Sequence, residues 1–127
     1  MGVTGETLVL TSNGYQQVGD LVNEIFKLVV DDEEYDTVGY GFSCDGNRDV
    51  YKIYLENGSY LKASDHHELL TDDGKWIRVD EIKKGDVLWN GNVVEKVGYL
   101  GCFYVYDCIV HNYNKYITEG GFYNKAN

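Results

Sequence analysis

The stretch VYKIYLENGSYLKA, residues 50–63, decides the fold class. Residues 50–55 are rich in β-branched and aromatic side chains and predict a strand. Glu56-Asn57-Gly58 predicts a turn, and residues 59–63 predict a second strand that returns along the first. This unit is typical of antiparallel β structure.

The flanking sequence has the same character. Residues 7–11 predict a strand that ends at the turn Ser12-Asn13-Gly14. Further short extended segments are expected at residues 76–79, 86–89, 93–99 and 103–110. Twelve tyrosines, fifteen glycines and no proline favour strands joined by glycine turns. We therefore expect an all-β fold.

Three segments depart from the strand pattern. A short amphipathic helix is predicted from apolar residues at helical spacing, Val18, Leu21, Val22, Ile25 and Phe26. Residues 80–84 predict one helical turn, ended by Gly85. The acidic residues 31–36 predict a solvated loop.

A weak internal repeat divides the chain into two halves. Thr11-Ser12-Asn13-Gly14 is similar to Thr71-Asp72-Asp73-Gly74, about sixty residues later, and a short apolar turn follows each copy. This repeat indicates a pseudo-two-fold relation between two halves. No linker-like segment separates them, so residues 1–127 are expected to form one domain.

The bulk composition excludes several classes of function. The net charge of −10, from 21 acidic and 11 basic residues, repels phosphate backbones and argues against nucleic-acid binding. Three cysteines without a CxxC pair argue against a zinc site and a disulfide framework, so no metal or other cofactor is expected. No apolar run approaches the roughly 20 residues that span a membrane, which makes the reducing cytosol the expected compartment.

The first candidate for chemistry is Ser64-Asp65-His66-His67. A hydroxyl and an imidazole three residues apart, just after a strand, point into one site if the chain turns between them. Histidine is the natural acid–base group near neutral pH. The alternative is a polar loop with two solvated histidines.

The second candidate is Asp107, inside the apolar run at residues 105–110. Burial of an unpaired carboxylate is costly, so Asp107 is an edge residue, a structural acceptor, or a catalytic group with a raised pKa. Alternation places His111 on its face of the strand. Cys108, on the other face, is expected to be a small buried hydrophobe rather than a nucleophile.

The third candidate is Asn127, because an asparagine amide can attack its own backbone carbonyl and cleave the chain.

Together, these sites follow the order of the intein splicing motifs, and the chain resembles that family over nearly its whole length. Residues 3–9, VTGETLV, resemble the motif that follows the first nucleophile. Residues 61–71, LKASDHHELLT, are similar to the second motif, with Ser64 at its threonine and His67 at its histidine. Residues 105–110, VYDCIV, resemble the third motif.

The resemblance implies a horseshoe-shaped Hint fold and a self-splicing activity. In inteins the first cysteine attacks the preceding carbonyl, and the second-motif threonine and histidine activate that amide. The residue after the intein then takes over the acyl group, and the terminal asparagine cyclises. The implied partners are flanking extein segments of a host protein, with a monomeric intein acting in cis or, if the gene is split, with a complementary fragment.

This sequence departs from the family at both ends. Gly2 occupies the position of the nucleophilic cysteine, so we expect a splicing-inactive form, made inert on purpose with Met1 as the start residue. Asn114 and Ala126 occupy the two positions where inteins usually carry histidines, and the tail after Gly121 is one residue longer than usual. Nothing follows Asn127, so no downstream acceptor is expected.

Only Asn90-Gly91-Asn92 lies where large inteins carry a homing endonuclease, so a mini-intein without DNA cleavage is implied. That loop and the acidic segment at residues 31–36 are the candidate split positions. Two other functions stay open: a hedgehog-like autoprocessing domain, which lacks the asparagine step, and a non-catalytic β-rich binding module. The intein interpretation predicts that Gly2 and Asn127 lie within roughly 10 Å of each other. It also predicts that His67, rather than His66, faces the N-terminal strand beside Ser64.

Overall fold

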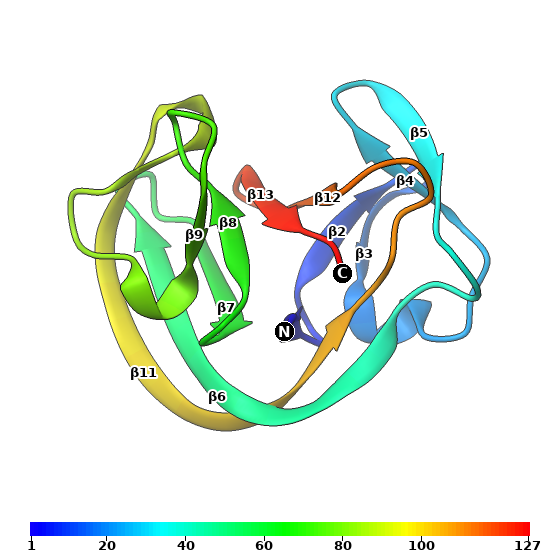
Figure 1. Cartoon of the computed structure of the whole chain (residues 1–127), viewed down its shortest axis with the longest axis horizontal. Coiled ribbons are helices and arrows are strands. Elements are labelled where there is room, and N and C mark those ends of the chain that lie inside the picture. The colour runs from blue at the N-terminus through cyan, green and yellow to red at the C-terminus, as the bar shows by residue number, and fades with distance from the viewer.

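Two long antiparallel strands form the frame of the molecule, β6 (Ser43–Leu55) and β11 (Asn92–Asp107). In the computed structural model, which describes residues 1–127, they curve together along the base of a horseshoe (Figure 1). Their register shifts at three places, for example between Tyr99 and Gly101. Because a β-bulge bends the strand that carries it, these shifts fit the curvature of the pair.

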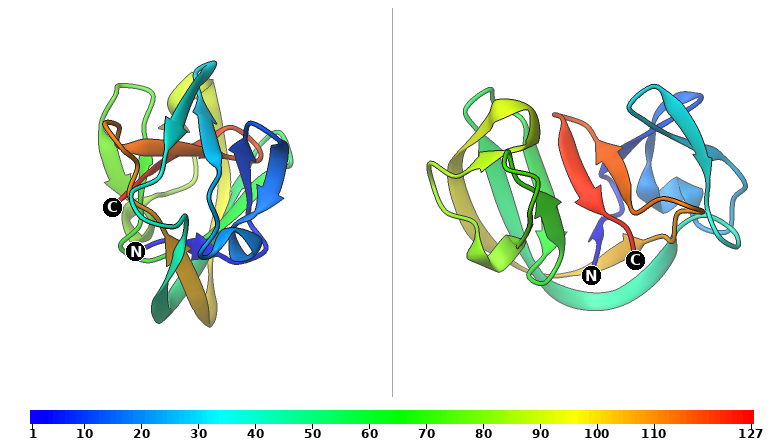
Figure 2. Two further views of the ribbon diagram at one scale, coloured as in Figure 1. Left: turned by 90° about the vertical axis from the view of Figure 1, so that its right-hand side faces the viewer. Right: turned by 45° about the horizontal axis from the view of Figure 1, so that its top comes forward.

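The remaining strands form the two arms and the centre of the horseshoe (Figures 1 and 2). One arm contains β7 (Tyr60–Ser64), β8 (Glu68–Leu70), β9 (Trp76–Arg78) and β10 (Val87–Leu88). The other contains β2 (Leu8–Thr11), β3 (Gly14–Gln17), β4 (Lys27–Val30) and β5 (Glu33–Asp36). Between them lie β1 (Val3–Thr4), β12 (Lys115–Thr118) and β13 (Phe122–Lys125).

The strands belong to two sheets. One has the order β1-β7-β6-β11-β10, and the other has the order β5-β4-β2-β12-β13-β8-β9, with β3 paired to β2. The predicted all-β fold and the hairpin at residues 50–63 are confirmed. The segments expected at residues 93–99 and 103–110 form one strand, which ends at Asp107.

The helical content is smaller than predicted, and consists of three 3₁₀ turns: η1 (Val18–Leu21), η2 (Val79–Glu81) and η3 (Trp89–Gly91). The amphipathic helix expected over residues 18–26 is wrong. Asn23 has a φ of 60°, a left-handed conformation that does not continue a right-handed helix. Ile25, one of the five apolar residues behind the prediction, is 81% exposed.

The acidic segment at residues 31–36 is also not a loop. It forms the turn and second strand of a hairpin in which Val30 pairs with Glu33. Asp31 and Asp32, the two residues of the turn, both have positive φ, as a type I′ hairpin turn requires. The strand β5 lies at the edge of its sheet, where charged side chains face water and oppose edge-to-edge association.

The pseudo-two-fold relation between the halves is visible in the backbone hydrogen bonds. In the first half, the N–H of Val18 donates to the carbonyl of Thr7 (2.9 Å). In the second half, the N–H of Val79 donates to the carbonyl of His67 (2.8 Å). Each half therefore continues from a β-hairpin into a 3₁₀ turn that is bonded back to the start of the hairpin.

One hydrophobic core runs through both arms. It contains Val9 and Leu28 from one arm, Leu61 and Leu69 from the other, and Tyr116 from the centre. The structure contains no helix with the length and hydrophobicity of a membrane span. Because the central strands pack against both arms, the core brings the two ends of the chain to the middle of the horseshoe (Figures 1 and 2).

Candidate functional site

Gly2 lies against β11 at the start of the chain. Val3 pairs with both Tyr106 and Ala63, and the carbonyl of Gly2 accepts a hydrogen bond from the N–H of Ser64 (2.9 Å). The φ of Gly2 is +137°, and a Cβ at this position would lie 2.3 Å from the carbonyl oxygen of Tyr106. This backbone conformation suits only glycine, so any side chain here requires residue 2 to move away from Tyr106.

The C-terminus is attached just after the end of β11. The N–H of Asn127 donates to the carbonyl of Cys108 (2.9 Å), and Cys108 is two residues beyond Tyr106. Two residues of extended chain span about 7 Å, so Gly2 and Asn127 contact neighbouring points of one segment. The three views of the ribbon agree that the two ends lie close together (Figures 1 and 2).

Ser64 and His67 both lie beside the N-terminal end of the chain. Ser64 is the last residue of β7 and is buried, and the carbonyl of Ser64 accepts a hydrogen bond from the N–H of His67 (3.0 Å). The two residues are therefore joined by a tight turn of the backbone, and both side chains are buried. His67 is fully buried, and its ring is close to that of Tyr116, with 6.5 Å between the ring centroids.

One ring nitrogen of His67 has a hydrogen-bond partner, and the other has none. Nε2 lies 2.9 Å from Oδ1 of Asn124, whereas Nδ1 is buried without a hydrogen-bond partner. Burial lowers the pKa of His67 to about 4, and the hydrogen bond with Asn124 acts in the opposite direction. At neutral pH the ring is therefore uncharged and has one free nitrogen.

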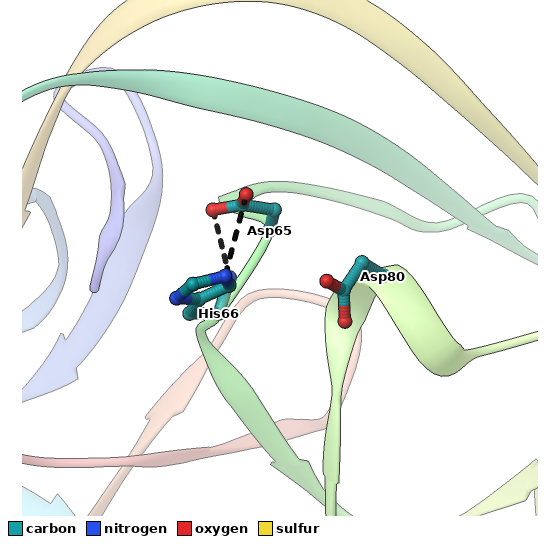
Figure 3. A group of neighbouring side chains, drawn as sticks. All are labelled: Asp65, His66 and Asp80. Carbon is teal, nitrogen blue, oxygen red and sulfur yellow. Dashed lines mark hydrogen bonds and ion pairs between the residues drawn. The ribbon is translucent and has the colours of Figure 1, made fainter.

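His66 has a different environment, as Figure 3 shows. Its side chain is 60% exposed, and its Nε2 lies 3.6 Å from the carboxylate of Asp65. Asp65, His66 and Asp80 could each offer a metal ligand, since their ligating atoms lie within 4.8 Å of one another. Arg78 already donates two hydrogen bonds to Asp80, at 2.6 and 3.1 Å. This group is therefore best described as a surface ion-pair cluster.

Asp107 is the buried acidic group of the site. It is 1% exposed, its Oδ1 accepts a hydrogen bond from the N–H of Cys108 (2.8 Å), and its Oδ2 has no partner. Burial raises its pKa to about 7, although the hydrogen bond from the N–H of Cys108 and the positive charge of the N-terminal amine lower it. A carboxyl group with such a pKa can both donate and accept a proton near neutral pH. Cys108 is buried, as expected, and its pKa is raised by burial.

The other residues considered for the C-terminal end have separate places. Ala126 is buried in the core, and its N–H donates to the carbonyl of Asn114 (2.9 Å). The side chain of Asn114 is exposed. The pairing of His111 with Asp107, expected if the strand continued that far, does not occur: β11 ends at Asp107, and His111 is exposed with its N–H bonded to the carbonyl of Asp36 (2.8 Å).

Sequence reasoning missed two residues of this site. Asn124, in β13, is fully buried and contacts His67, and Tyr116, in β12, is fully buried with a phenol oxygen that has no partner. Burial raises the pKa of Tyr116 well above its usual value, and the nearby Asp107 adds to the effect. An asparagine inside the run at residues 122–125 was the available signal, because an amide in a buried strand needs partners.

The structure therefore gathers most of the predicted residues. The polar side-chain atoms that are buried without a partner are all in this region, namely Ser64 Oγ, His67 Nδ1, Asp107 Oδ2 and Tyr116 OH. Unpartnered buried polar atoms are rare and costly in native proteins, and they commonly mark a site that binds or reacts. Here they lie in the region where the two chain ends are attached, which makes this region the candidate functional site.

Comparison with known proteins supports the fold. No protein-family model and no curated sequence matches this chain. The DnaB intein from Synechocystis sp. PCC 6803 matches with a TM-score of 0.80 and 20% identity, covering 98% of this chain and 98% of that chain. The MchDnaB-1 intein matches with a TM-score of 0.77 and 19% identity, covering 99% and 100%. The gp41-1 intein matches with a TM-score of 0.78 and 17% identity, covering 99% and 98%. The protein has the horseshoe-shaped Hint fold of the inteins.

Proposed function

We propose that this chain is the splicing domain of an intein, which excises itself and joins the flanking extein segments of a host protein. The reaction comprises an N–S acyl shift, a transesterification and an asparagine cyclisation. The observation that carries the proposal is the attachment of the two chain ends at neighbouring places, to the end of β11 and to Cys108 just after it, beside four unpartnered buried polar atoms. Splicing requires such a site, because both scissile peptide bonds must react in one place.

The proposed roles follow from the environments of the residues. Ser64 Oγ is a buried hydroxyl that can stabilise the oxyanion at the N-terminal junction. His67, neutral at physiological pH, accepts and returns a proton through Nδ1. At the C-terminal junction, Asp107 serves as the acid–base group for cyclisation of Asn127. Gly2 has no nucleophile, so the first step does not begin in this form.

Residues 1–127 act as one splicing domain without an endonuclease, since only the short turn η3 joins β10 to β11. We propose a monomer that binds no nucleic acid, because its net charge is −10. Cys44, Cys102 and Cys108 are all free thiols, which fits a reducing, cytosolic environment.

The test is to restore the nucleophile. A tag protein is joined in front of residue 2 and a second tag, beginning with cysteine, after Asn127, in Gly2→Cys and Gly2→Ala variants. Both variants place a Cβ against Tyr106, so they share any backbone shift, but only cysteine can attack. Ligated tags in the cysteine variant alone support an intein. N-terminal cleavage that is not followed by ligation or by release of the second tag, even when Asn114→His restores a histidine, indicates a hedgehog-like domain. No processing in either variant supports a non-catalytic binding module.

The C-terminal junction has its own test in the Gly2→Cys protein. Neither usual histidine is present, so release of the second tag is expected to be slow and to fall further in Asp107→Ala. Asn114→His is the better restoration, because Asn114 is exposed whereas Ala126 is packed in the core, where a histidine would displace its neighbours. Faster release in Asn114→His is expected. Fast release from the parent, unaffected by Asp107→Ala, would contradict the assigned role of Asp107.

A further inference from the structure

The side-chain amide of Asn124 is enclosed by polar groups on both of its ends. Oδ1 lies 2.9 Å from Nε2 of His67. Nδ2 faces three acceptors: Thr118 Oγ1 at 3.0 Å, the carbonyl of Phe122 at 3.2 Å and the carbonyl of Tyr116 at 3.4 Å. Asn124 is 0% exposed, so no water competes for these positions.

The acceptors determine which way the amide points. A main-chain carbonyl can only accept a hydrogen bond, so the end of the amide that faces Phe122 and Tyr116 must be the NH₂ group. The reversed orientation would place Oδ1 against two carbonyl oxygens with no proton between them. Oδ1 therefore faces His67, and an amide oxygen can only accept.

The orientation of Asn124 determines the position of the proton on His67. Nε2 must carry a hydrogen in order to donate to Oδ1, and a neutral imidazole has only one N–H. Nδ1 is then left with a lone pair, and this buried atom has no partner within the chain.

We infer that Asn124 is a positioning residue that holds His67 in the Nε2–H tautomer, so that the lone pair of Nδ1 is presented to the N-terminal junction. Asn124 belongs to β13, where it pairs with Leu69 of β8, two residues after His67. The contact thus exists only when the C-terminal strand is docked beside the second motif. Because Asn127 follows three residues later, docking of the tail also prepares the histidine at the opposite junction.

The consequence for chemistry rests on the proposed splicing function. When a cysteine at residue 2 attacks the preceding carbonyl, a C–S bond forms and the C–N bond breaks. The thiol proton passes to Nδ1 and then to the departing amine, so His67 ends as it began. While Nδ1 holds the proton, the Nε2–H···Oδ1 bond stabilises the imidazolium. The Nδ1–H tautomer has no lone pair at that nitrogen to accept the proton.

The tautomer can be observed without any splicing. In a His66→Gln/His111→Gln double variant of this chain, His67 is the only remaining imidazole. Long-range ¹H–¹⁵N correlation spectra at pH 7.5 distinguish a protonated ring nitrogen from one with a lone pair by their ¹⁵N shifts. A single species with hydrogen on Nε2 is expected. A single Nδ1–H species, or averaged shifts from two tautomers, would overturn the inference with no further variant.

Substitutions at Asn124 and Thr118 test whether Asn124 fixes the tautomer of His67. Asn124→Leu removes the acceptor at similar volume, and we expect mixed tautomers. Asn124→Asp keeps an acceptor for Nε2–H, and we expect the Nε2–H tautomer to persist with a raised pKa of His67. Thr118→Val is the matched control, since it removes a partner of Nδ2 but leaves Oδ1 on His67, and we expect a spectrum like that of the double variant. A folded Asn124→Leu protein that keeps a pure Nε2–H form would show that something else fixes the ring.

The Gly2→Cys protein connects the tautomer to function. N-terminal cleavage is expected to slow by about 10- to 100-fold in Asn124→Leu, to be partly rescued in Asn124→Asp, and to change little in Thr118→Val. An Nε2–H tautomer in a Gly2→Cys protein that never cleaves would refute the splicing proposal and leave the structural assignment of Asn124 intact. A cleaving protein with an Nδ1–H tautomer would refute the role of Asn124 alone.

Discussion

His66 and His67 are chemically identical neighbours in opposite environments. The first is exposed beside Asp65, and the second is fully buried with one free ring nitrogen. Only a buried group with a fixed orientation can act efficiently on a peptide bond at the chain start. At the scale of single residues, function therefore depends on burial and on hydrogen-bond partners more than on residue type.

This difference predicts the effect of replacing each histidine. In the Gly2→Cys protein with an upstream tag, His67→Ala should slow thiol-induced release of the tag by about 100-fold or more, the usual contribution of an acid–base group. His66→Ala should change it less than about twofold, because His66 faces solvent. Gel densitometry over time gives both rates. Equal effects, or a larger effect of His66→Ala, would contradict the assignment of His67.

Asp107 predicts a pH dependence of stability. Burial raises its pKa from 3.8 to about 7, so the folded state binds a proton that the unfolded state loses. The stability that this bound proton contributes is fully present below pH 3.8 and is lost as pH rises through about 7. Asp107→Asn removes the dependence, and its free energy of unfolding should rise relative to the parent by on the order of 2–4 kcal/mol between pH 4 and pH 8.

Urea denaturation of both proteins at pH 4, 6 and 8 measures this difference. His67 has the opposite dependence, because its pKa is lowered to about 4 and its contribution is lost as pH falls from about 6.5. It is present in both proteins, so its effect cancels. A difference that stays constant with pH would show that Asp107 is not buried as a neutral group.

At the scale of elements, the turn of the β4–β5 hairpin contains two residues with strained backbone conformations, which differ in their hydrogen bonding. Asp31 and Asp32 both have positive φ, but only Asp31 also accepts a hydrogen bond, from the hydroxyl of Tyr123 (2.6 Å). Glycine adopts positive φ without steric cost. Asp32→Gly should therefore stabilise the protein by about 0.5 kcal/mol, the relief of strain less the entropy of glycine.

Asp31→Gly is the matched control for this turn. It relieves the same kind of strain but removes the partner of Tyr123, at a cost of about 1 kcal/mol. The thermal unfolding midpoint should therefore order the proteins with Asp32→Gly first and Asp31→Gly last. If both glycine variants are equally stabilised, the bond between Asp31 and Tyr123 contributes nothing.

For the whole molecule, the long pairing of β6 with β11 predicts reassembly after a cut. A break between Asn90 and Gly91 falls in η3, at the turn before β11. The fragments 1–90 and 91–127 would share the β6–β11 ladder and the central strands β12 and β13. Mixed fragments should form a 1:1 complex in size-exclusion chromatography, whereas a β6 variant with Ile53→Asp, which places a charge in the core, should not.

The sequence by itself determined the β class, the hairpin at residues 50–63 and the internal repeat, and it placed Ser64 and His67 on one turn. These features depend on short-range order: alternation along a strand, turn residues, and the three-residue spacing of Ser64 and His67. The same reasoning singled out Asp107, because a carboxylate in an apolar run indicates a special environment, and the structure shows that this residue is buried.

Only the tertiary structure decided the rest. The five apolar residues at helical spacing fit either a helix or a 3₁₀ turn followed by irregular chain. Backbone bonds from Leu21 and Val22 to Gly41 and Phe42 favour the 3₁₀ turn. The contact of Asn124 with His67, and the approach of Gly2 to Tyr106, join residues that are far apart in the sequence. No local pattern encodes such pairs, because they form only when burial of the shared core brings the two chain ends to the centre of the horseshoe.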